Sequence, residues 1–147
     1  MSGRKTCLIV FLLFTFLFPF HQLAAQEKEH SEKQMLDWPG FLERAMDDEE
    51  IAREIFNEFL KEIPIKIDNI NKAVNIGDAL ELKLEAHTLK GSSANAGAIG
   101  LQDIAYKIEQ SAADEDFKKA AALVPELEKN LKITTRQYNN MILKTGG

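Results

Sequence analysis

One histidine in this chain lies in sequence surroundings that would let another protein reach it. His87 is followed three residues later by Lys90, and then by a run of small residues that includes Gly91 and Ala94. On a helix, these small residues would leave the imidazole accessible and Lys90 would place a cation one turn away. A neutral imidazole is a nucleophile near neutral pH. If it accepted a phosphoryl group, the lysine ammonium could offset the new negative charge.

His87 can be approached only from the outer side of its helix, and the surrounding sequence predicts that position. Small and apolar residues recur every three or four positions from residue 82 to residue 96, which is the spacing of one helix face. This predicted core-facing stripe consists of Leu82, Ala86, Leu89, Ser93 and Ala96. His87 falls to one side of the stripe, so we expect it to face solvent. The predicted docking surface for a partner protein then comprises Lys83, Leu80, Leu84, Gly91 and Ala94.

Helical spacing and capping signals predict an all-α chain from Met35 onward. Asp37 can cap a short helix and Asp47 a long one, because aspartate accepts hydrogen bonds from first-turn amides. Pro64 is expected to kink the long helix, and Gly77 to end it in the left-handed conformation. The residues predicted to line the core side of the long helix are Ile51, Ile55, Phe59, Ile63, Ile67, Ile70 and Val74.

Three further helices complete the predicted fold. Asp78 starts the helix that carries His87, and Gly97 marks its end. A shorter helix ends near Ala112, and the last helix contains Pro125, which either bends or divides it. Because short connections make neighbouring helices antiparallel, we predict an up-down-up-down four-helix bundle, with the first short helix capping one end.

Length, charge and cysteine content limit the classes of function. The 147 residues are enough for one domain. The net charge is −5, and every acidic residue follows residue 25, so residues 26–147 carry a charge of −7. An acidic domain is a poor match for nucleic acid, so we expect no nucleic-acid partner. Cys7 is the only cysteine, which excludes a disulfide framework and a thiolate metal cluster.

The first 25 residues differ from the rest of the chain. A basic start, the apolar run of residues 6–20 and small residues at the end are typical of a secretory signal peptide. Residues 26–34 are polar and predict a linker, and residues 35–147 form the predicted bundle domain. Three explanations stay open: the first segment is a membrane anchor, it is a signal peptide, or translation begins at Met35. We favour the third.

The segment AHTLKGSSANAGA, residues 86–98, resembles the signature of histidine phosphotransfer (HPt) domains. The matching positions are His87, Lys90, Gly91 and Gly97. The resemblance extends from about Leu36 to Leu143. It implies a four-helix bundle in which His87 is phosphorylated and Lys90 is the charge partner of the phosphate. It also implies a phosphoryl carrier without a nucleotide site or kinase activity of its own.

The resemblance further implies a place in two-component signalling. HPt domains relay phosphoryl groups between receiver domains, so the implied partners are response-regulator receiver domains and hybrid histidine kinases. No cofactor is expected on this domain, and Mg²⁺ is expected on the partner receiver only. The implied location of the domain is the cytoplasm, because the receivers and ATP are there. Contact with a membrane is expected only if the N-terminal segment is kept as an anchor.

Two alternatives differ in class from a phosphoryl carrier. A metal-binding bundle needs inward-facing Glu-x-x-His pairs on two helices. Here Glu85 precedes His87 by only two residues, and the other histidines, His21 and His30, precede the bundle domain. We therefore expect no metal site. The second alternative, an exported or membrane-anchored helical interaction module that carries no phosphate, stays open.

Overall fold

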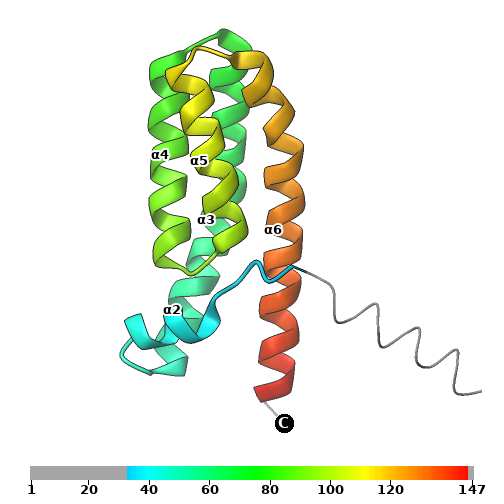
Figure 1. Ribbon diagram of the computed structural model, residues 1–147. Coiled ribbons are helices and arrows are strands. Elements are labelled where there is room, and N and C mark those ends of the chain that lie inside the picture. The colour runs from blue at the N-terminus through cyan, green and yellow to red at the C-terminus, as the bar shows by residue number, and fades with distance from the viewer. Residues whose placement is uncertain (1–32, 146–147) are drawn as a thin grey trace, which may run out of the picture. The chain divides into compact units, whose positions relative to one another are not determined.

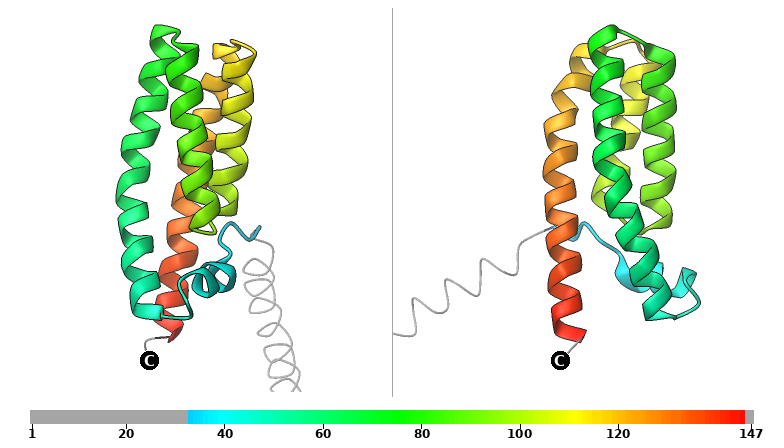
Figure 2. Two further views of the ribbon diagram at one scale, coloured as in Figure 1. Left: turned by 90° about the vertical axis from the view of Figure 1, so that its left-hand side faces the viewer. Right: turned by 180° about the vertical axis from the view of Figure 1, so that it is seen from behind.

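The computed structural model describes residues 33–145, and these residues form helices and turns without a strand. The helices are α2 (Trp38–Arg44), α3 (Glu49–Ile76), α4 (Ala79–Asn95), α5 (Ile99–Ala113) and α6 (Phe117–Thr145). The four long helices run alternately up and down, and α6 returns beside α3 (Figures 1 and 2). The bundle therefore has the order α3–α4–α5–α6 around its axis, and the predicted all-α four-helix bundle is confirmed.

Aspartate side chains begin four of the helices, α2, α3, α4 and α6, by accepting hydrogen bonds from first-turn amides. The Asp37 carboxylate accepts from the Gly40 amide at 3.1 Å, and the Asp78 carboxylate accepts from the Glu81 amide at 2.9 Å, as predicted. The prediction that Asp47 caps the long helix is wrong by one residue. Asp48 is the cap of α3, because Asp47 has a φ of 58° and belongs to the preceding turn.

Neither internal proline ends its helix. α3 continues through Pro64 and α6 continues through Pro125, so Pro125 does not divide the last helix. A proline removes one backbone hydrogen bond from a helix, and burial of one side of these long helices against the bundle compensates for that loss. α3 ends at Gly77, whose φ of 71° confirms the predicted left-handed C-terminal position.

The core contains one stripe from each long helix. On α4, the predicted stripe is confirmed, with each of its five members buried. On α3, the prediction is wrong for the first two turns: Ile51 and Ile55 are each 49% exposed, whereas Ala52 and Phe56 are fully buried. The difference follows from aromatic packing, because the Phe56 ring lies 5.7 Å from the Trp38 ring and 4.5 Å from the Tyr138 ring.

The segment that contains α2 covers the end of the bundle where α4 turns into α5 (Figure 1). The Asp37 amide donates to the Gly97 carbonyl at 2.7 Å, and the Gly100 amide donates to the Met35 carbonyl at 3.3 Å. Gly97 has a φ of 68°, and a side chain there would collide with the Asp37 carbonyl. The predicted capping helix is therefore held by backbone pairing with the turn that ends the His87 helix.

The predictions for residues 1–25 and for most of the 26–34 linker lie outside the described residues. From Gln34 onward, the described residues pack as one compact unit. Between residues 33 and 145, no helix combines the length and the apolar character that crossing a membrane requires.

Candidate functional site

His87 lies in the middle of α4 and faces away from the core. Its neighbours on the buried side, Ala86 and Leu89, are fully buried, whereas the His87 side chain is 65% exposed. The helix therefore presents the imidazole to solvent, as the sequence pattern predicts. A partner protein can reach the ring without any rearrangement of the bundle.

Glu109 on α5 joins His87 to Lys90. Its carboxylate oxygen Oε1 lies 2.7 Å from His87 Nδ1, and its other oxygen, Oε2, accepts a hydrogen bond from Lys90 Nζ at 2.6 Å. The Glu109 side chain is only 9% exposed, so the carboxylate lies beneath the two α4 side chains. The buried Glu109 carboxylate thus contacts both His87 and Lys90, the two residues for which the sequence predicted a chemical role.

The charge of Glu109 determines which His87 nitrogen carries the proton in the neutral ring. The hydrogen bond from Lys90 lowers the pKa of the Glu109 carboxyl below its ordinary value. Burial alone would raise that pKa, but the hydrogen bond from His87 lowers it further. An ionised carboxylate can only accept hydrogen bonds. Nδ1 of His87 must therefore carry the proton and donate to Glu109. In the neutral ring, the lone pair is then on Nε2, the nitrogen that can attack an electrophile.

Lys90 is held close to His87 but is not directed at solvent. Its side chain is 28% exposed, and its ammonium lies 5.7 Å from the centre of the Tyr106 ring as well as against Glu109. Lys83, which belongs to the predicted docking surface, is exposed one turn before His87. The structure thus brings Lys90 into the same cluster as His87, whereas Lys83 lies on the surface around it.

The predicted docking surface is exposed on α4. Leu80 is 80% exposed and Leu84 is 57% exposed, so two large apolar side chains reach the surface of α4 before His87. Gly91 is exposed and Ala94 is partly exposed. His87 therefore lies between two apolar side chains that precede it on α4 and two small residues that follow it.

Gly91 has no packing role that requires glycine. A Cβ atom added at this position would meet no atom within 4 Å. Ser93, by contrast, is fully buried, and its hydroxyl has no hydrogen-bond partner among the described residues. Gly91 therefore keeps open space beside His87, whereas Ser93 is a small residue of the core.

Replacing Gly91 with alanine should stabilise the fold and slow the phosphotransfer that the sequence resemblance implies. Glycine inside a helix costs about 1 kcal/mol relative to alanine, and a methyl group has free space at this site. The same methyl group would occupy the space through which a partner approaches the His87 ring, so we expect a transfer rate several-fold lower. Chemical denaturation measures the first effect and transfer kinetics the second. An unchanged transfer rate would show that the partner does not use this space.

A second buried carboxylate provides a comparison for Glu109. Glu85, on the other side of α4, accepts a hydrogen bond from the Asn69 amide at 3.0 Å and pairs with Lys66 at 3.1 Å. Both partners belong to α3, so this cluster ties α3 to α4 without touching His87. Glu109 differs because both of its described partners come from α4 and one of them is the exposed imidazole.

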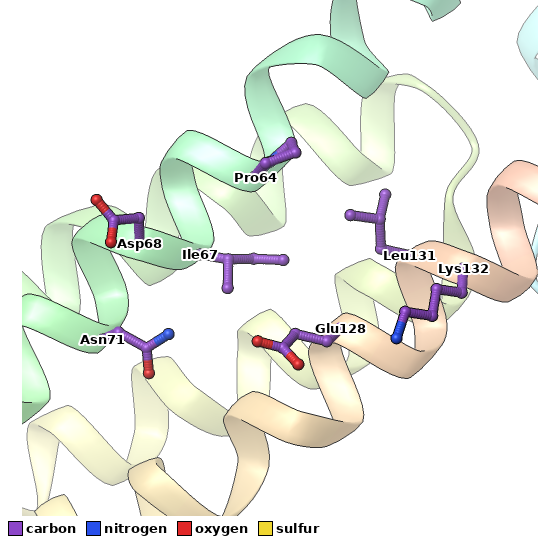
Figure 3. Close-up of a pocket in the computed structure, with 7 residues that line it drawn as sticks. All are labelled: Pro64, Ile67, Asp68, Asn71, Glu128, Leu131 and Lys132. Carbon is purple, nitrogen blue, oxygen red and sulfur yellow. The ribbon is translucent and has the colours of Figure 1, made fainter.

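The α3–α6 side of the bundle contains a groove that does not belong to the His87 cluster. Its volume is about 330 Å³. Figure 3 shows its lining, which comprises Pro64, Ile67, Asp68, Asn71, Glu128, Leu131 and Lys132. Since α3 and α6 lie opposite the α4–α5 edge in the bundle (Figure 2), the groove faces away from His87. Across residues 33–145, no three His, Cys, Asp or Glu side chains are grouped so that they could hold a metal ion.

The fold and the site together define a class of protein, a four-helix bundle that presents one nucleophilic histidine beside a lysine. The Hpt domain model matches residues 54–136, which is more than half of the chain and includes His87, Lys90 and Glu109. The chain therefore belongs to the Hpt domain family.

A solved structure supports the same assignment. The chain is similar to histidine-containing phosphotransfer protein B (HptB) from Pseudomonas aeruginosa PAO1, with 25% sequence identity and a TM-score of 0.67. The match covers 77% of this chain and 98% of the HptB chain. A comparison with curated protein sequences gave no match.

Proposed function

We propose that this protein relays a phosphoryl group between receiver-domain aspartates in a two-component phosphorelay, with His87 as the carrier. The observation that supports this most directly is the 65% exposed imidazole whose Nδ1 is engaged by the buried Glu109 carboxylate. Membership of the Hpt domain family supports the same assignment. The chain would act as a phosphoryl carrier and not as a kinase.

The proposed transfer needs no group beyond the two proteins and the metal of the receiver. The Nε2 lone pair of His87 attacks the phosphorus of an aspartyl phosphate on the receiver. The N–P bond forms, the bond between phosphorus and the aspartate oxygen breaks, and the aspartate leaves as a carboxylate. The ring keeps its Nδ1 proton and becomes positively charged. Glu109, at 2.7 Å from Nδ1, stabilises that charge. The reverse steps pass the phosphoryl group to a second aspartate.

Lys90 would neutralise part of the phosphoryl charge on His87. Its ammonium is bound to Glu109 in the structure, and a phosphoryl group on the neighbouring ring would compete with that carboxylate for it. We propose no metal or cofactor on this chain. The divalent metal ion belongs to the receiver, where it polarises the aspartyl phosphate.

The proposed partners, receiver domains and the hybrid histidine kinases that carry them, would dock on the exposed side of α4. The docking surface consists of Leu80, Lys83, Leu84, Gly91 and Ala94. Leucines with more than half of their surface in water gain free energy when a partner buries them. Since receivers and ATP are cytoplasmic, the proposed function places the domain in the cytoplasm.

Replacing Leu84 with glutamate should weaken receiver docking about tenfold, because burying an unpaired carboxylate costs on the order of 1.4 kcal/mol or more. The matched control is Ile65→Glu, since Ile65 on α3 is also highly exposed, at 62% against 57% for Leu84. Titration of a receiver against each variant measures the dissociation constant. If both variants bind like the unchanged protein, the docking surface lies elsewhere.

Phosphotransfer from a receiver is the decisive test of the proposed function. The full chain is incubated with candidate receivers carrying labelled aspartyl phosphate. We expect label that is acid-labile and alkali-stable, as a phosphoramidate is, and that maps to His87. A helical interaction module that carries no phosphate would bind a partner but remain unlabelled. Absence of label with every candidate receiver would reject the phosphorelay function.

A further inference from the structure

Tyr106 is an exposed aromatic residue close to the site. It lies on α5, one turn before Glu109, and is 51% exposed. Throughout residues 33–145, the other aromatic side chains are buried or partly buried. About half of the Tyr106 surface is not used in packing the bundle. Its exposure therefore indicates a role outside the core.

The Tyr106 ring is close to the reactive cluster. Lys90 Nζ lies 5.7 Å from the centre of the ring, which is within the range of a cation–π interaction. The same ammonium donates to Glu109 at 2.6 Å. Tyr106 and Glu109 thus contact Lys90 from the same helix, and the ring restricts where the ammonium can move.

The size of a typical docking surface places Tyr106 within it. A specific interface covers about 800 Å² on each partner, which corresponds to a disc roughly 16 Å in radius. Neighbouring helices in a bundle are about 8–10 Å apart. A partner centred on His87 therefore reaches across α4 onto α5. Lys90 shares Glu109 with His87 and also lies beside the Tyr106 ring. The Tyr106 ring therefore lies near the centre of that disc.

We propose that Tyr106 is the α5 anchor of the receiver-docking surface and a positioning residue for Lys90. This inference rests on the proposed phosphotransfer function and extends its docking surface from α4 to both α4 and α5. The proposed occupant is a receiver domain, which brings a phosphorylated aspartate and therefore negative charge to a site bordered by Lys83 and Lys90.

Two properties of the tyrosine ring support the two roles. A tyrosine buries a large area with few rotatable bonds, which makes it a common source of binding energy at interfaces. When the receiver excludes water, the attraction between the ring and the Lys90 ammonium strengthens. Docking would then fix the ammonium beside the phosphoryl oxygens at the moment of transfer. Binding and transfer should therefore both depend on the ring.

The test compares Tyr106→Phe, Tyr106→Leu and Tyr106→Ala in the full chain. Phenylalanine keeps the ring, so we expect binding and transfer close to those of the unchanged protein. Alanine should raise the receiver dissociation constant about tenfold, as loss of an interface anchor does. Leucine keeps much of the apolar area but not the ring. It should bind with a smaller loss than alanine while lowering the transfer rate at saturating receiver, because Glu109 alone then restrains Lys90.

The control and the possible outcomes separate this inference from the proposed function. Ile65→Ala removes an exposed apolar side chain on α3 and should change neither quantity, and thermal unfolding checks that each variant is folded. If the unchanged protein is labelled but Tyr106→Ala binds and transfers as well as it does, the inference about Tyr106 is wrong and the proposed function stands. If Tyr106→Leu transfers at the unchanged rate, the positioning role is wrong. If the unchanged protein takes no label from any receiver, the proposed function fails and this inference fails with it.

Discussion

Replacing His87 with glutamine is expected to abolish phosphoryl labelling of the chain while leaving the bundle folded. Glutamine has no nucleophilic ring nitrogen, so no N–P bond can form at this position. The His87 side chain is 65% exposed and contributes little to the core, and a glutamine amide can still donate a hydrogen bond to Glu109. The measurements are acid-labile label from a phosphorylated receiver and thermal unfolding of the variant.

Two further variants make the result specific to His87. His87→Ala also removes the nucleophile and should also take no label, which excludes an effect of the glutamine amide. His30→Gln, at a histidine outside the described residues, should be labelled like the unchanged protein. Label that persists on both His87 variants would reject His87 as the carrier and would leave the family assignment without its proposed site.

Much of the fold could be predicted because the helices carry local signals. Aspartates at helix starts and the left-handed Gly77 are determined by residues within one or two turns, and the stripe on α4 follows from spacing alone. The errors on α3 arise where tertiary packing decides. Ile51 and Ile55 have helical spacing, but Phe56 is the residue that reaches Trp38 and Tyr138. Those contacts join α3 to α2 and to α6, and they depend on how the helices pack and not on the spacing within α3.

The site could be predicted on α4 but not on α5. His87, Lys90 and Gly91 lie close together in sequence, so their spacing on one helix predicted that they form one site. Glu109 is 22 residues from His87, and its contact with Nδ1 depends on the register of α5 against α4. One signal was present: Glu109 directly follows the buried Ile108 and precedes the buried Ser111 and Ala112. A carboxylate that is buried beside a core stripe needs a hydrogen-bond or charge partner, but the sequence did not predict that His87 and Lys90 are those partners.

Replacing Glu109 with glutamine is the prediction with the second-largest expected effect. Glutamine preserves the shape of the side chain but loses the charge that stabilises the positive ring during transfer and that holds the Lys90 ammonium. Loss of one preorganised electrostatic group at a reaction centre lowers a rate by on the order of a hundredfold. We expect a reduction of that size in the rate of transfer to His87 at saturating receiver, measured by rapid quenching.

Glu85→Gln is the matched control for this prediction. Glu85 is also a buried carboxylate with a lysine and an amide donor as partners, but these lie on α3. Its replacement should therefore lower stability without changing the transfer rate. If both variants slow transfer equally, the effect of Glu109 is only structural. If Glu109→Gln transfers at the unchanged rate, Glu109 has no role in the reaction.

The pH dependence of stability provides a second readout for Glu109. Because its pKa is lowered in the folded protein, the ionised carboxylate stabilises the fold. That contribution is complete above the ordinary carboxyl pKa of 4.5 and is lost as the pH falls through the lower, folded-state pKa. Below about pH 4.5, the unchanged protein should therefore lose stability more steeply than Glu109→Gln, which has no carboxyl group to protonate at this position. Parallel slopes in thermal unfolding from pH 7 to pH 3 would show that the pKa of Glu109 is the same in the folded and unfolded states. The contacts with Lys90 and His87 would then not stabilise the charge of Glu109.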